Sequence, residues 1–384
     1  MRVAINGLHL IPGRLGGLET YLHELLRDLA TAKRPEHELV IYSSRKYASA
    51  FDSYRDSFQV IPVDVNVDQA VARIWFEQTR LSRFVQRDRI DILHSSGYTA
   101  PSMKICRTVM TVHDLCYLEI PEMIRQGQGA LRWLALRMLG PRSLKNSDRL
   151  ITDTHHVAAQ INSRYGIQQN RIHTLHLKPM RDFSKINIEP VSLPSHFNAG
   201  YLFYVGSWLP HKNHRLLLTA LAEAKRREIE LPPLVLAGLH LNSDRQRDEF
   251  ASMVASLNIG DRVFACPNAL TVEQLAGLYR SAKLFVFPSL FEGYGYPVVE
   301  AMSARVPVLC SNLEPMLEVS AGQATTFDPH DPEDLLRAVQ RLLNRPEECR
   351  DLVERGYRRY VQLCEQTGNN GNSVFQIYES VLRS

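Results

Sequence analysis

Short apolar strand patterns alternate with helical patterns along both halves of the 384-residue chain. In the first half, β-branched or apolar runs stand at 2–6, 38–43, 59–63, 91–95, 107–114 and 149–153. Between several of them, apolar residues recur three and four positions apart, as in LETYLHELLRDLATA, which is the spacing of an amphipathic helix. This alternation predicts βα units around a parallel sheet.

The second half repeats this pattern. Strand patterns in YLFYVG, PLVLAG, RVFAC, KLFVFPS and VPVLCS are separated by helical ones such as NHRLLLTALAEAKRRE and PEDLLRAVQRLLN. We therefore expect an α/β fold with two doubly wound Rossmann-like domains and a ligand cleft between them, at the carboxyl ends of their strands. The expected domains are 1–183 and 199–365. Residues 179–198, rich in Pro and Ser, are typical of a linker, and the C-terminal segment 366–384 is expected to be helical.

Composition excludes several protein classes. Hydrophobic residues make up 45% and charged residues 22% of the chain, which argues against disorder. No apolar run approaches the roughly 20 residues that span a bilayer, and the N-terminus lacks the apolar segment of a signal peptide, so we expect a cytoplasmic protein. The six cysteines are scattered without metal-ligand spacing, so we expect neither a zinc site nor a disulfide framework.

Charge is distributed unevenly. The net charge is +4; residues 1–190 hold 26 lysines and arginines against 19 acidic residues (+7), and the remainder holds 19 against 22 (−3). No basic stripe with interleaved aromatics accompanies this excess, so nucleic acid is not an expected partner; an acidic membrane surface or a phosphate-bearing substrate fits better. Residues 129–145 mix Trp133 and leucines with arginines and would suit peripheral contact with an anionic membrane. A core helix with basic ends is the alternative, which we favour.

The segment LFEGYGYPVVEAM follows the strand pattern KLFVF. Gly293 and Gly295 allow backbone angles and close approaches that a side chain blocks, and Pro297 suits the first position of a helix. Backbone amides and a positive helix end at this turn predict a site for an anion such as a diphosphate.

Two glutamates flank this turn. Glu292 precedes it and Glu300 falls in the expected first helical turn, and a carboxylate can accept hydrogen bonds from the two hydroxyls of a diol. Each glutamate would therefore suit a sugar ring. Alternatively, Glu300 only complements the helix charge and Glu292 is a solvated loop residue.

Three further strand-to-helix loops hold candidates. Gly206 ends the YLFYVG strand, and Lys212 stands before the next helix, where its cation would reach the same diphosphate; a surface lysine is the alternative. Gly16 and Gly17 precede a helix without matching GxGxxG, which suits a phosphate-approach or acceptor-side loop, or else a flexible turn. His113 ends an apolar strand, where side chains reach the cleft; a satisfied structural histidine is the alternative.

Taken together, these motifs resemble the retaining glycosyltransferases of family four, which have the GT-B fold. The likeness covers nearly the whole chain, from GGLETYLHELLRDLA through VHD and DRLITDTHHVAAQI to YVGSWLPHKNHRLLLTAL, FEGYGYPVVEAM and FDPHDPEDLLRAV. The two glutamates separated by seven residues are its most specific element. The resemblance implies that a nucleotide diphosphate sugar binds mainly to the second domain and an acceptor to the first, and that the C-terminal helix crosses back onto the first domain.

The resemblance also implies residue roles. Glu300 would hold the ribose hydroxyls, Glu292 would contact the donor sugar, and Lys212 would bind the diphosphate. His113 would lie near the reacting carbon, and residues 266–270 would lie beside the nucleobase. The implied catalytic residues are His113, Glu292 and Lys212, and the implied donor-binding residues are Gly16, Gly17, Ser207, Lys212, Glu292, Gly293, Gly295, Tyr296 and Glu300.

One position departs from the family pattern. Many members have an arginine where this chain has Ser207, so a second cation for the diphosphate is missing; Arg14, Arg215 or a backbone amide could take its place. The PHKN and VHDL forms of two loops resemble mannosyltransferase-like members, so GDP-mannose is favoured over UDP-sugars as donor.

The resemblance implies a metal-independent reaction without a cofactor, and the chain has no Asp-x-Asp triplet. Transfer with retention would proceed by front-face attack, in which the leaving phosphate assists deprotonation of the acceptor. The acceptor would be a glycan or a lipid-linked sugar, with the enzyme in the cytoplasm or peripheral on the inner face of the plasma membrane. A non-catalytic nucleotide-sugar-binding protein and a GT-B sugar-nucleotide epimerase stay open as alternatives.

Overall fold

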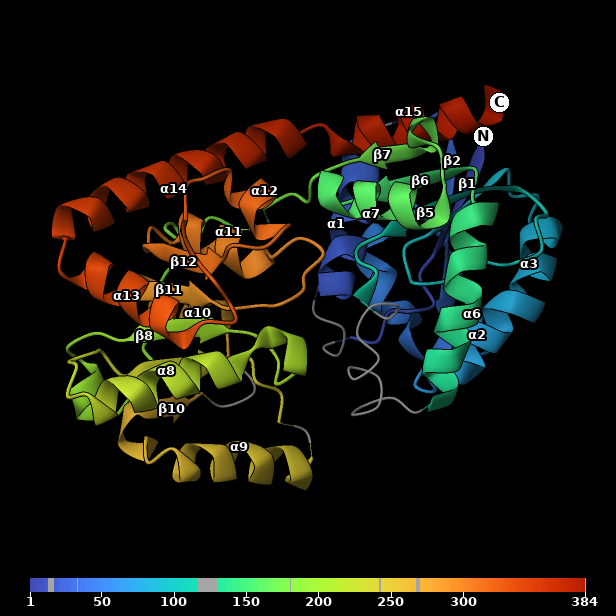
Figure 1. Cartoon of the computed structure of the whole chain (residues 1–384). Helices are drawn as coiled ribbons and strands as arrows, with labels where there is room; N and C mark the ends of the chain where they lie inside the picture. The colour runs from blue at the N-terminus through green and yellow to red at the C-terminus, as the bar shows by residue number, and fades with distance from the viewer. Residues whose placement is uncertain are drawn as a thin grey trace. The chain divides into compact units, whose positions relative to one another are not determined.

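The computed structural model describes residues 1–12, 17–32, 34–116, 130–179, 181–241, 243–266 and 270–383 (Figure 1). The chain divides into two compact units. Unit 1 comprises Met1–Lys178 and Gln366–Ser384, and unit 2 comprises Pro179–Glu365. The Gly16 and Arg14 candidates, and most of the predicted nucleobase segment 266–270, lie outside the described residues.

The described strands of unit 1 form a seven-stranded sheet in the order β3-β2-β1-β4-β5-β6-β7. All neighbours pair in parallel, with Val3 of β1 opposite Leu39 on one side and Ile92 on the other. The strands are β1 (Arg2–Asn6), β2 (Glu38–Ser44), β3 (Gln59–Val63), β4 (Ile92–Ser95), β5 (Arg107–Val112), β6 (Arg149–Thr152) and β7 (Ile172–Thr174). This confirms the predicted parallel α/β arrangement; the sequence pattern missed β7.

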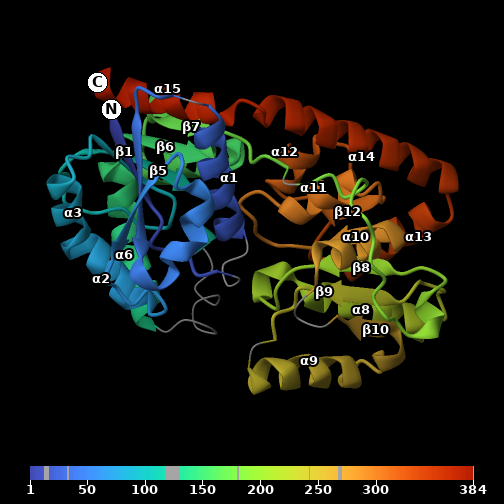
Figure 2. The ribbon, with the colours of Figure 1, turned by 180° about the vertical axis from the view of Figure 1, so that it is seen from behind.

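Helices cover both faces of this sheet. The chain runs from β1 to β2 in one direction along the sheet and from β4 to β7 in the other, so right-handed crossovers place the connecting helices on opposite faces. The helix α1 packs with α15, and α2 packs with α6 (Figures 1 and 2). The described helices of unit 1 are α1 (Gly17–Thr31), α2 (Ala70–Thr79), α3 (Leu81–Arg87), α6 (Ala130–Asn146), α7 (His155–Tyr165) and α15 (Asn370–Arg383), with short 3₁₀ turns at Arg45–Tyr54 and Gln169–Arg171.

Unit 2 has a parallel sheet of six described strands in the order β10-β9-β8-β11-β12-β13. Its core includes a run of aromatic rings in which Phe285 contacts Phe203 and Phe287, each with ring centroids 6.1 Å apart. The strands are β8 (Leu202–Val205), β9 (Leu234–Ala237), β10 (Val263–Ala265), β11 (Leu284–Phe287), β12 (Val308–Ser311) and β13 (Thr325–Phe327). Both units therefore have the predicted Rossmann-like architecture.

Helices connect the strands of unit 2 as the periodicity predicts. They are α8 (His214–Arg226), α9 (Asp244–Ser256), α10 (Val272–Ser281), α11 (Tyr296–Ser303), α12 (Met316–Ser320), α13 (Pro332–Leu343) and α14 (Pro346–Thr367), with 3₁₀ turns at Ser195–Phe197, Pro210–Lys212 and Gly260–Arg262. The sequence pattern did not predict α12, α14 or β13.

The stretch predicted as a linker packs onto unit 2. Phe183 is buried, its ring contacts Tyr279 edge to face at 5.2 Å, and its amide donates to the Ser303 hydroxyl at 3.2 Å. The carbonyl of Glu189 lies so close to Gly277 that a Cβ there would stand 2.9 Å away. These contacts anchor the predicted linker stretch to unit 2.

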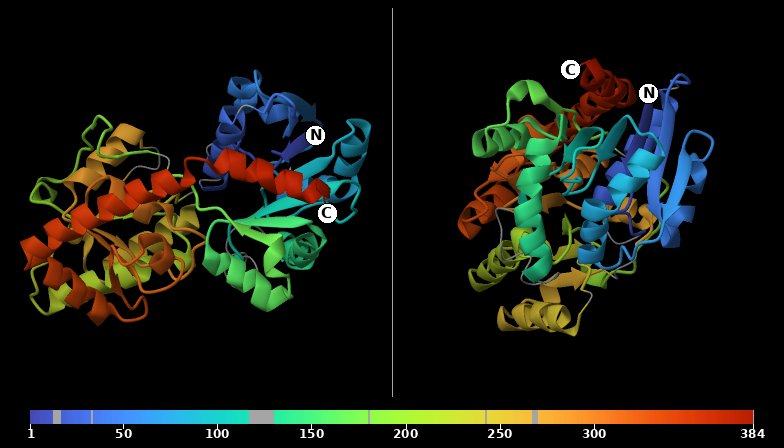
Figure 3. Two further views of the ribbon diagram at one scale, coloured as in Figure 1. Left: turned by 90° about the horizontal axis from the view of Figure 1, so that it is seen from above. Right: turned by 90° about the vertical axis from the view of Figure 1, so that its right-hand side faces the viewer.

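The C-terminal helix α15 completes unit 1. Gly371 sits against the backbone of α1, and a Cβ at this position would overlap the Asp28 carbonyl. Further along α15, the Glu379 carboxylate lies 3.9 Å from His37 Nε2, and His37 Nδ1 contacts the N-terminal amine at 3.4 Å. The helix therefore ends beside the start of the chain (Figure 3).

The structure bears on two expectations, the core position of the 129–145 segment and the absence of a membrane-spanning helix. Residues 130–146 form α6, which packs on the core of unit 1 along one side only: Leu136 and Leu144 are buried, whereas Leu131 is 71% exposed. Among the described helices, none is both long and apolar enough to cross a membrane.

We predict that Gly371→Val destabilises the protein. A side chain at residue 371 collides with backbone that cannot move away, so α15 must separate from α1, and overpacking of this kind costs about 1–3 kcal/mol. Thermal unfolding with and without the change would measure it. Gly260→Val is the matched control, because a Cβ there meets nothing within 4 Å; equal melting temperatures for both variants would contradict the prediction.

Candidate active site

The loops after β8 and β11 meet at the carboxyl edge of the unit 2 sheet. The Leu290 amide donates to the His211 carbonyl at 2.7 Å, and the Asn213 side-chain amide donates to the Pro288 carbonyl at 3.1 Å. Asn213 has a left-handed backbone, with φ of 56°, which turns the chain into α8. These bonds fix the two loops in register and bring their side chains together.

An ion pair forms where these loops meet. Lys212 Nζ donates to Glu292 Oε1 at 2.6 Å, and the Ser289 hydroxyl donates to the same oxygen at 2.6 Å. The two side chains are only 16% and 11% exposed, and Nζ also lies 5.6 Å from the centre of the Phe287 ring. Two predicted site residues are thus in direct contact, and neither is a solvated surface residue.

Gly206 makes room for a buried tyrosine beneath this pair. A Cβ at residue 206 would overlap the Tyr204 hydroxyl. That hydroxyl is buried and has no hydrogen-bond partner among the described residues. Burial, followed by the nearby Glu292 charge, raises the pKa of Tyr204 well above its ordinary value. A buried donor without a partner is unusual in a structural role.

The turn after Glu292 begins α11. Gly295 is the N-cap with φ of 90°, a conformation that favours glycine, and its added Cβ would stand 3.1 Å from Met316 Sδ. Gly293 has no such positive φ. Because α11 starts at Tyr296, Pro297 is its second residue and Glu300 lies beyond the first turn. The predicted positions of Pro297 and Glu300 within the helix were therefore wrong, and helix-charge complementation does not explain Glu300.

Glu300 instead faces α10. The Tyr279 hydroxyl donates to Glu300 Oε2 at 2.9 Å. Burial raises the pKa of Glu300, opposed by the Tyr279 hydrogen bond and by the charge of Arg181. Within the described residues, no hydrogen bond or ion pair joins Glu300 to Lys212 or Glu292, so the predicted site residues of unit 2 form two groups.

The remaining candidate residues of unit 2 make a backbone hydrogen bond and an aromatic contact. The Ser207 carbonyl accepts a hydrogen bond from the Leu209 amide at 2.8 Å. Tyr296 contacts Tyr294 edge to face at 5.4 Å. Arg215, a proposed substitute for the missing arginine, is exposed on α8. Sequence analysis missed Ser289, Tyr279 and Arg181, since no pattern marks them.

His113 lies at the carboxyl edge of the unit 1 sheet, directly after β5. Its Nδ1 is 2.6 Å from Asp153 Oδ2, and its ring contacts Tyr21 edge to face at 4.4 Å. Burial disfavours the protonated ring, but the charge and hydrogen bond of Asp153 outweigh it, so the pKa of His113 is raised. Asp153 was not predicted, because it is brought to His113 only by the pairing of β5 with β6.

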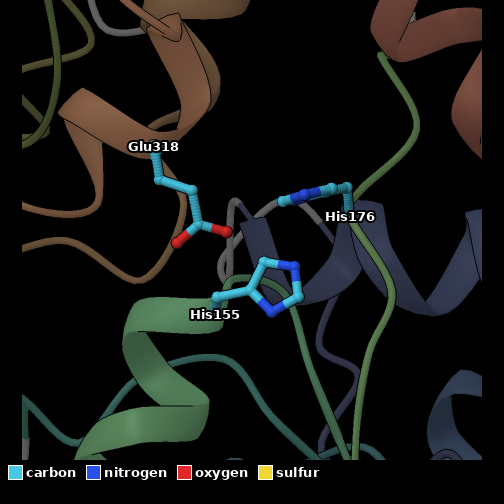
Figure 4. Close-up of side chains that lie close together, drawn as sticks. All are labelled: His155, His176 and Glu318. Atoms are coloured by element: carbon cyan, nitrogen blue, oxygen red, sulfur yellow. The ribbon is translucent and has the colours of Figure 1, made fainter.

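Asp153 is itself held by a second histidine. His176 Nδ1 bonds the Asp153 carbonyl oxygen at 3.1 Å. The ring of His176 contacts His155, the first residue of α7, with centroids 5.7 Å apart (Figure 4). Glu318, also drawn in Figure 4, belongs to unit 2. The His176 contact thus holds the Asp153 backbone, from which the carboxylate that bonds His113 extends.

Polar side chains without strong partners surround His113. His9 follows β1 and is 4% exposed, with no hydrogen-bond partner at either ring nitrogen within the described parts; the Asn6 carbonyl offers only weak compensation. Burial, with smaller contributions from the charges of Arg73 and His113, lowers the pKa of His9 to about 3. The Ser96 hydroxyl is buried and unpartnered as well. The strand ends of unit 1 thus present neutral groups that can bond hydroxyls.

Comparison with known proteins is consistent with this geometry. Residues 15–177 match the family model described as Glycosyltransferase Family 4, and residues 189–359 match Glycosyl transferases group 1. The O-antigen chain mannosyltransferase B of Escherichia coli is 28% identical over 66% of this chain and 65% of its own length. The MMP alpha-(1->4)-mannosyltransferase of Mycolicibacterium hassiacum is 33% identical over 40% of this chain and 37% of its own. The matches therefore span less than two thirds of these relatives.

Solved structures share the fold. The sucrose-phosphate synthase of Thermosynechococcus elongatus superposes with a TM-score of 0.76 at 18% identity, covering 100% of this chain and 99% of its own. Anabaena HepE in complex with UDP-glucose gives 0.68 at 14% identity, covering 100% of both chains. With two family models that together cover most of its length, the chain belongs to the family 4, group 1 glycosyltransferases of the GT-B fold.

Proposed function

We propose that this protein transfers a hexose, with mannose favoured, from a nucleotide diphosphate sugar to a glycan or lipid-linked acceptor. The buried Lys212–Glu292 pair carries the proposal, because it places a cation and a carboxylate beside the Gly295 turn at the start of α11. A diphosphate can bind to the cation and to the helix amides, and the hydroxyls of a sugar ring can donate hydrogen bonds to the carboxylate. Mannose is supported by the names of the relatives, two of which are mannosyltransferases.

In this proposal, the glycosidic bond to the diphosphate breaks while the acceptor oxygen bonds to the anomeric carbon on the same face. The acceptor proton passes to the leaving phosphate. Lys212 and the amides at the start of α11 neutralise the charge that develops on that phosphate, so the reaction is proposed to need neither a metal ion nor a cofactor. GDP-mannose is the favoured donor over UDP-sugars. A lipid-linked acceptor would bring the enzyme to the inner face of the plasma membrane.

The first test is binding and turnover of purified protein. A selective thermal shift with GDP-mannose, measured beside UDP-, ADP- and TDP-sugars, would identify the donor, because a ligand that binds only the native state raises its stability. Hydrolysis of the nucleotide sugar that gives the shift, or transfer of its hexose to an acceptor, is then measured. Binding without turnover would favour a nucleotide-sugar-binding protein, and an epimerised donor without acceptor would favour an epimerase.

We predict that Lys212→Ala lowers kcat with the identified donor about 10²-fold, because removal of one preorganised charge-stabilising donor has effects of this size. Steady-state kinetics would measure it. Arg215→Ala tests the exposed arginine as a substitute cation. Arg358→Ala, an exposed arginine on α14, is the matched control and should leave kcat unchanged. Full activity in Lys212→Ala would remove the lysine from the diphosphate site.

We predict that Glu300 makes nucleotide binding pH-dependent. Its pKa is raised by burial, so its carboxylate is lost at a higher pH than for an exposed glutamate, and affinity falls as pH drops through that raised pKa. Calorimetric titration with the nucleoside diphosphate at several pH values would show this. Glu300→Gln should bind more weakly and lose the acid dependence. An unchanged pH profile in Glu300→Gln would contradict the assignment.

We predict that the His113–Asp153 pair stabilises the folded protein at acid pH. The pKa of His113 is raised above its unfolded value of roughly 6.5, so this stability is complete below that value and is lost as pH rises through the folded pKa. Asp153→Asn removes the main opposition to burial, leaving only the Asp114 charge and the Ser96 backbone hydrogen bond, and should lower the His113 pKa. Selective ¹³C labelling of histidine with NMR titration would follow it; a His113 resonance that titrates alike in both proteins would refute the pairing.

A further inference from the structure

Large apolar side chains are exposed on two neighbouring helices of unit 1. On α6, Leu131 is 71%, Leu134 47% and Met138 50% exposed. On α2, Trp75 is 54% and Val71 45% exposed. These five residues, which we call the α2–α6 face, hold half of the large hydrophobic side chains found exposed in the described chain. Such a concentration on one pair of helices marks an interaction site.

The exposed residues are not needed to join the helices. Ile74 of α2 and Leu136 of α6 are buried together, with Trp133, Leu139 and Tyr98 packed around them. Positions 131, 134 and 138 are spaced three and four residues apart, as are 71 and 75, so each set shares one side of its helix. Each helix therefore has a packed side and a second, apolar side that faces solvent.

The charged side chains described on α6 are all positive. Of the described side chains of α6, Arg132, Arg137, Arg142 and Lys145 are charged and none is acidic. The acid of α2, Glu77, is 1% exposed and bound to Arg73 at 2.9 Å. The acidic charge of α2 is thus removed from the surface.

Two of the cations lie over indole rings. The Arg80 guanidinium, directly after α2, is 5.2 Å from the Trp75 ring centre, and Arg137 is 4.9 Å from that of Trp133. Each such pair combines an apolar ring with a charged group. This combination is favoured at the boundary between the hydrocarbon and the polar headgroups of a membrane.

We propose that the α2–α6 face binds an anionic lipid bilayer. Trp75, Leu131 and Leu134 enter the boundary between headgroups and acyl chains, and the surrounding arginines meet lipid phosphates. A second copy of the chain is a poorer occupant, because a symmetric contact would set one positive face against another. Membrane binding by the exposed apolar side chains and arginines of this face is independent of the proposed sugar transfer.

The test is co-sedimentation of the full-length protein with vesicles. Vesicles of phosphatidylcholine and phosphatidylglycerol in equal parts should bind the protein, pure phosphatidylcholine vesicles should not, and added salt should weaken binding. Trp75→Ser combined with Leu131→Ser should reduce partitioning about tenfold or more, as should Arg80→Glu combined with Arg137→Glu, since each removes several apolar or charge contacts. Ile188→Ser combined with Arg358→Glu, an exposed pair in unit 2, is the control and should bind as wild type.

Three outcomes would overturn the proposal. They are failure of the wild type to sediment with anionic vesicles, equal binding to neutral vesicles, and equal loss of binding in the control. Sedimentation velocity without lipid is run in parallel: a dimer that Trp75→Ser combined with Leu131→Ser abolishes would assign the face to a second copy instead. Thermal unfolding of the same variants, without ligand or vesicles, shows whether they are folded and does not depend on the proposed transfer.

Discussion

Parallel pairing of the strands is the constraint on which the rest of the structure depends. When neighbouring strands run the same way, their strand-to-helix loops share one edge of the sheet. The pairing of Leu284 with Leu202 therefore brings the loop after β11 beside the loop after β8, and Glu292 meets Lys212 across 80 positions of sequence. In unit 1, the same geometry sets His113 beside Asp153.

Under the proposed function, the Lys212–Glu292 pair prepares the site for a ligand and adds little to the stability of the fold. Withdrawing two charges from water costs several kcal/mol per ion, and the attraction between them about offsets this cost. Glu292 Oε1 also accepts the Ser289 hydroxyl, so the carboxylate keeps its orientation if Lys212 turns toward a phosphate. In this proposal, the pair would hold both groups in place until the diphosphate competes for the lysine.

Sequence alone predicted the alternating elements, because strands and turns leave local signals. It also named Lys212, Glu292, Glu300 and His113 as site candidates, which stays a prediction. It did not predict their contacts. Tyr279 contacts Glu300 and Asp153 contacts His113 only because the fold brings these residues together from separate elements. β7 and β13 are three residues each, too short for a periodic signal, and the start of α11 was misplaced because Gly295 rather than Pro297 sets it.

The surroundings of His113 depend on the far end of the chain. Tyr21, whose ring contacts His113, bonds Thr111 Oγ1 at 2.7 Å; Thr111 bonds His94 Nε2 at 2.8 Å, and His94 Nδ1 bonds the Tyr378 hydroxyl at 2.6 Å. Burial lowers the pKa of His94 to about 3, so its ring is neutral, with one nitrogen donating a hydrogen bond and the other accepting one. The hydroxyls of Tyr21, Thr111 and Tyr378 must therefore all donate in the same direction along this chain of hydrogen bonds. Because Tyr378 lies on α15, the C-terminal helix is part of the architecture that positions His113.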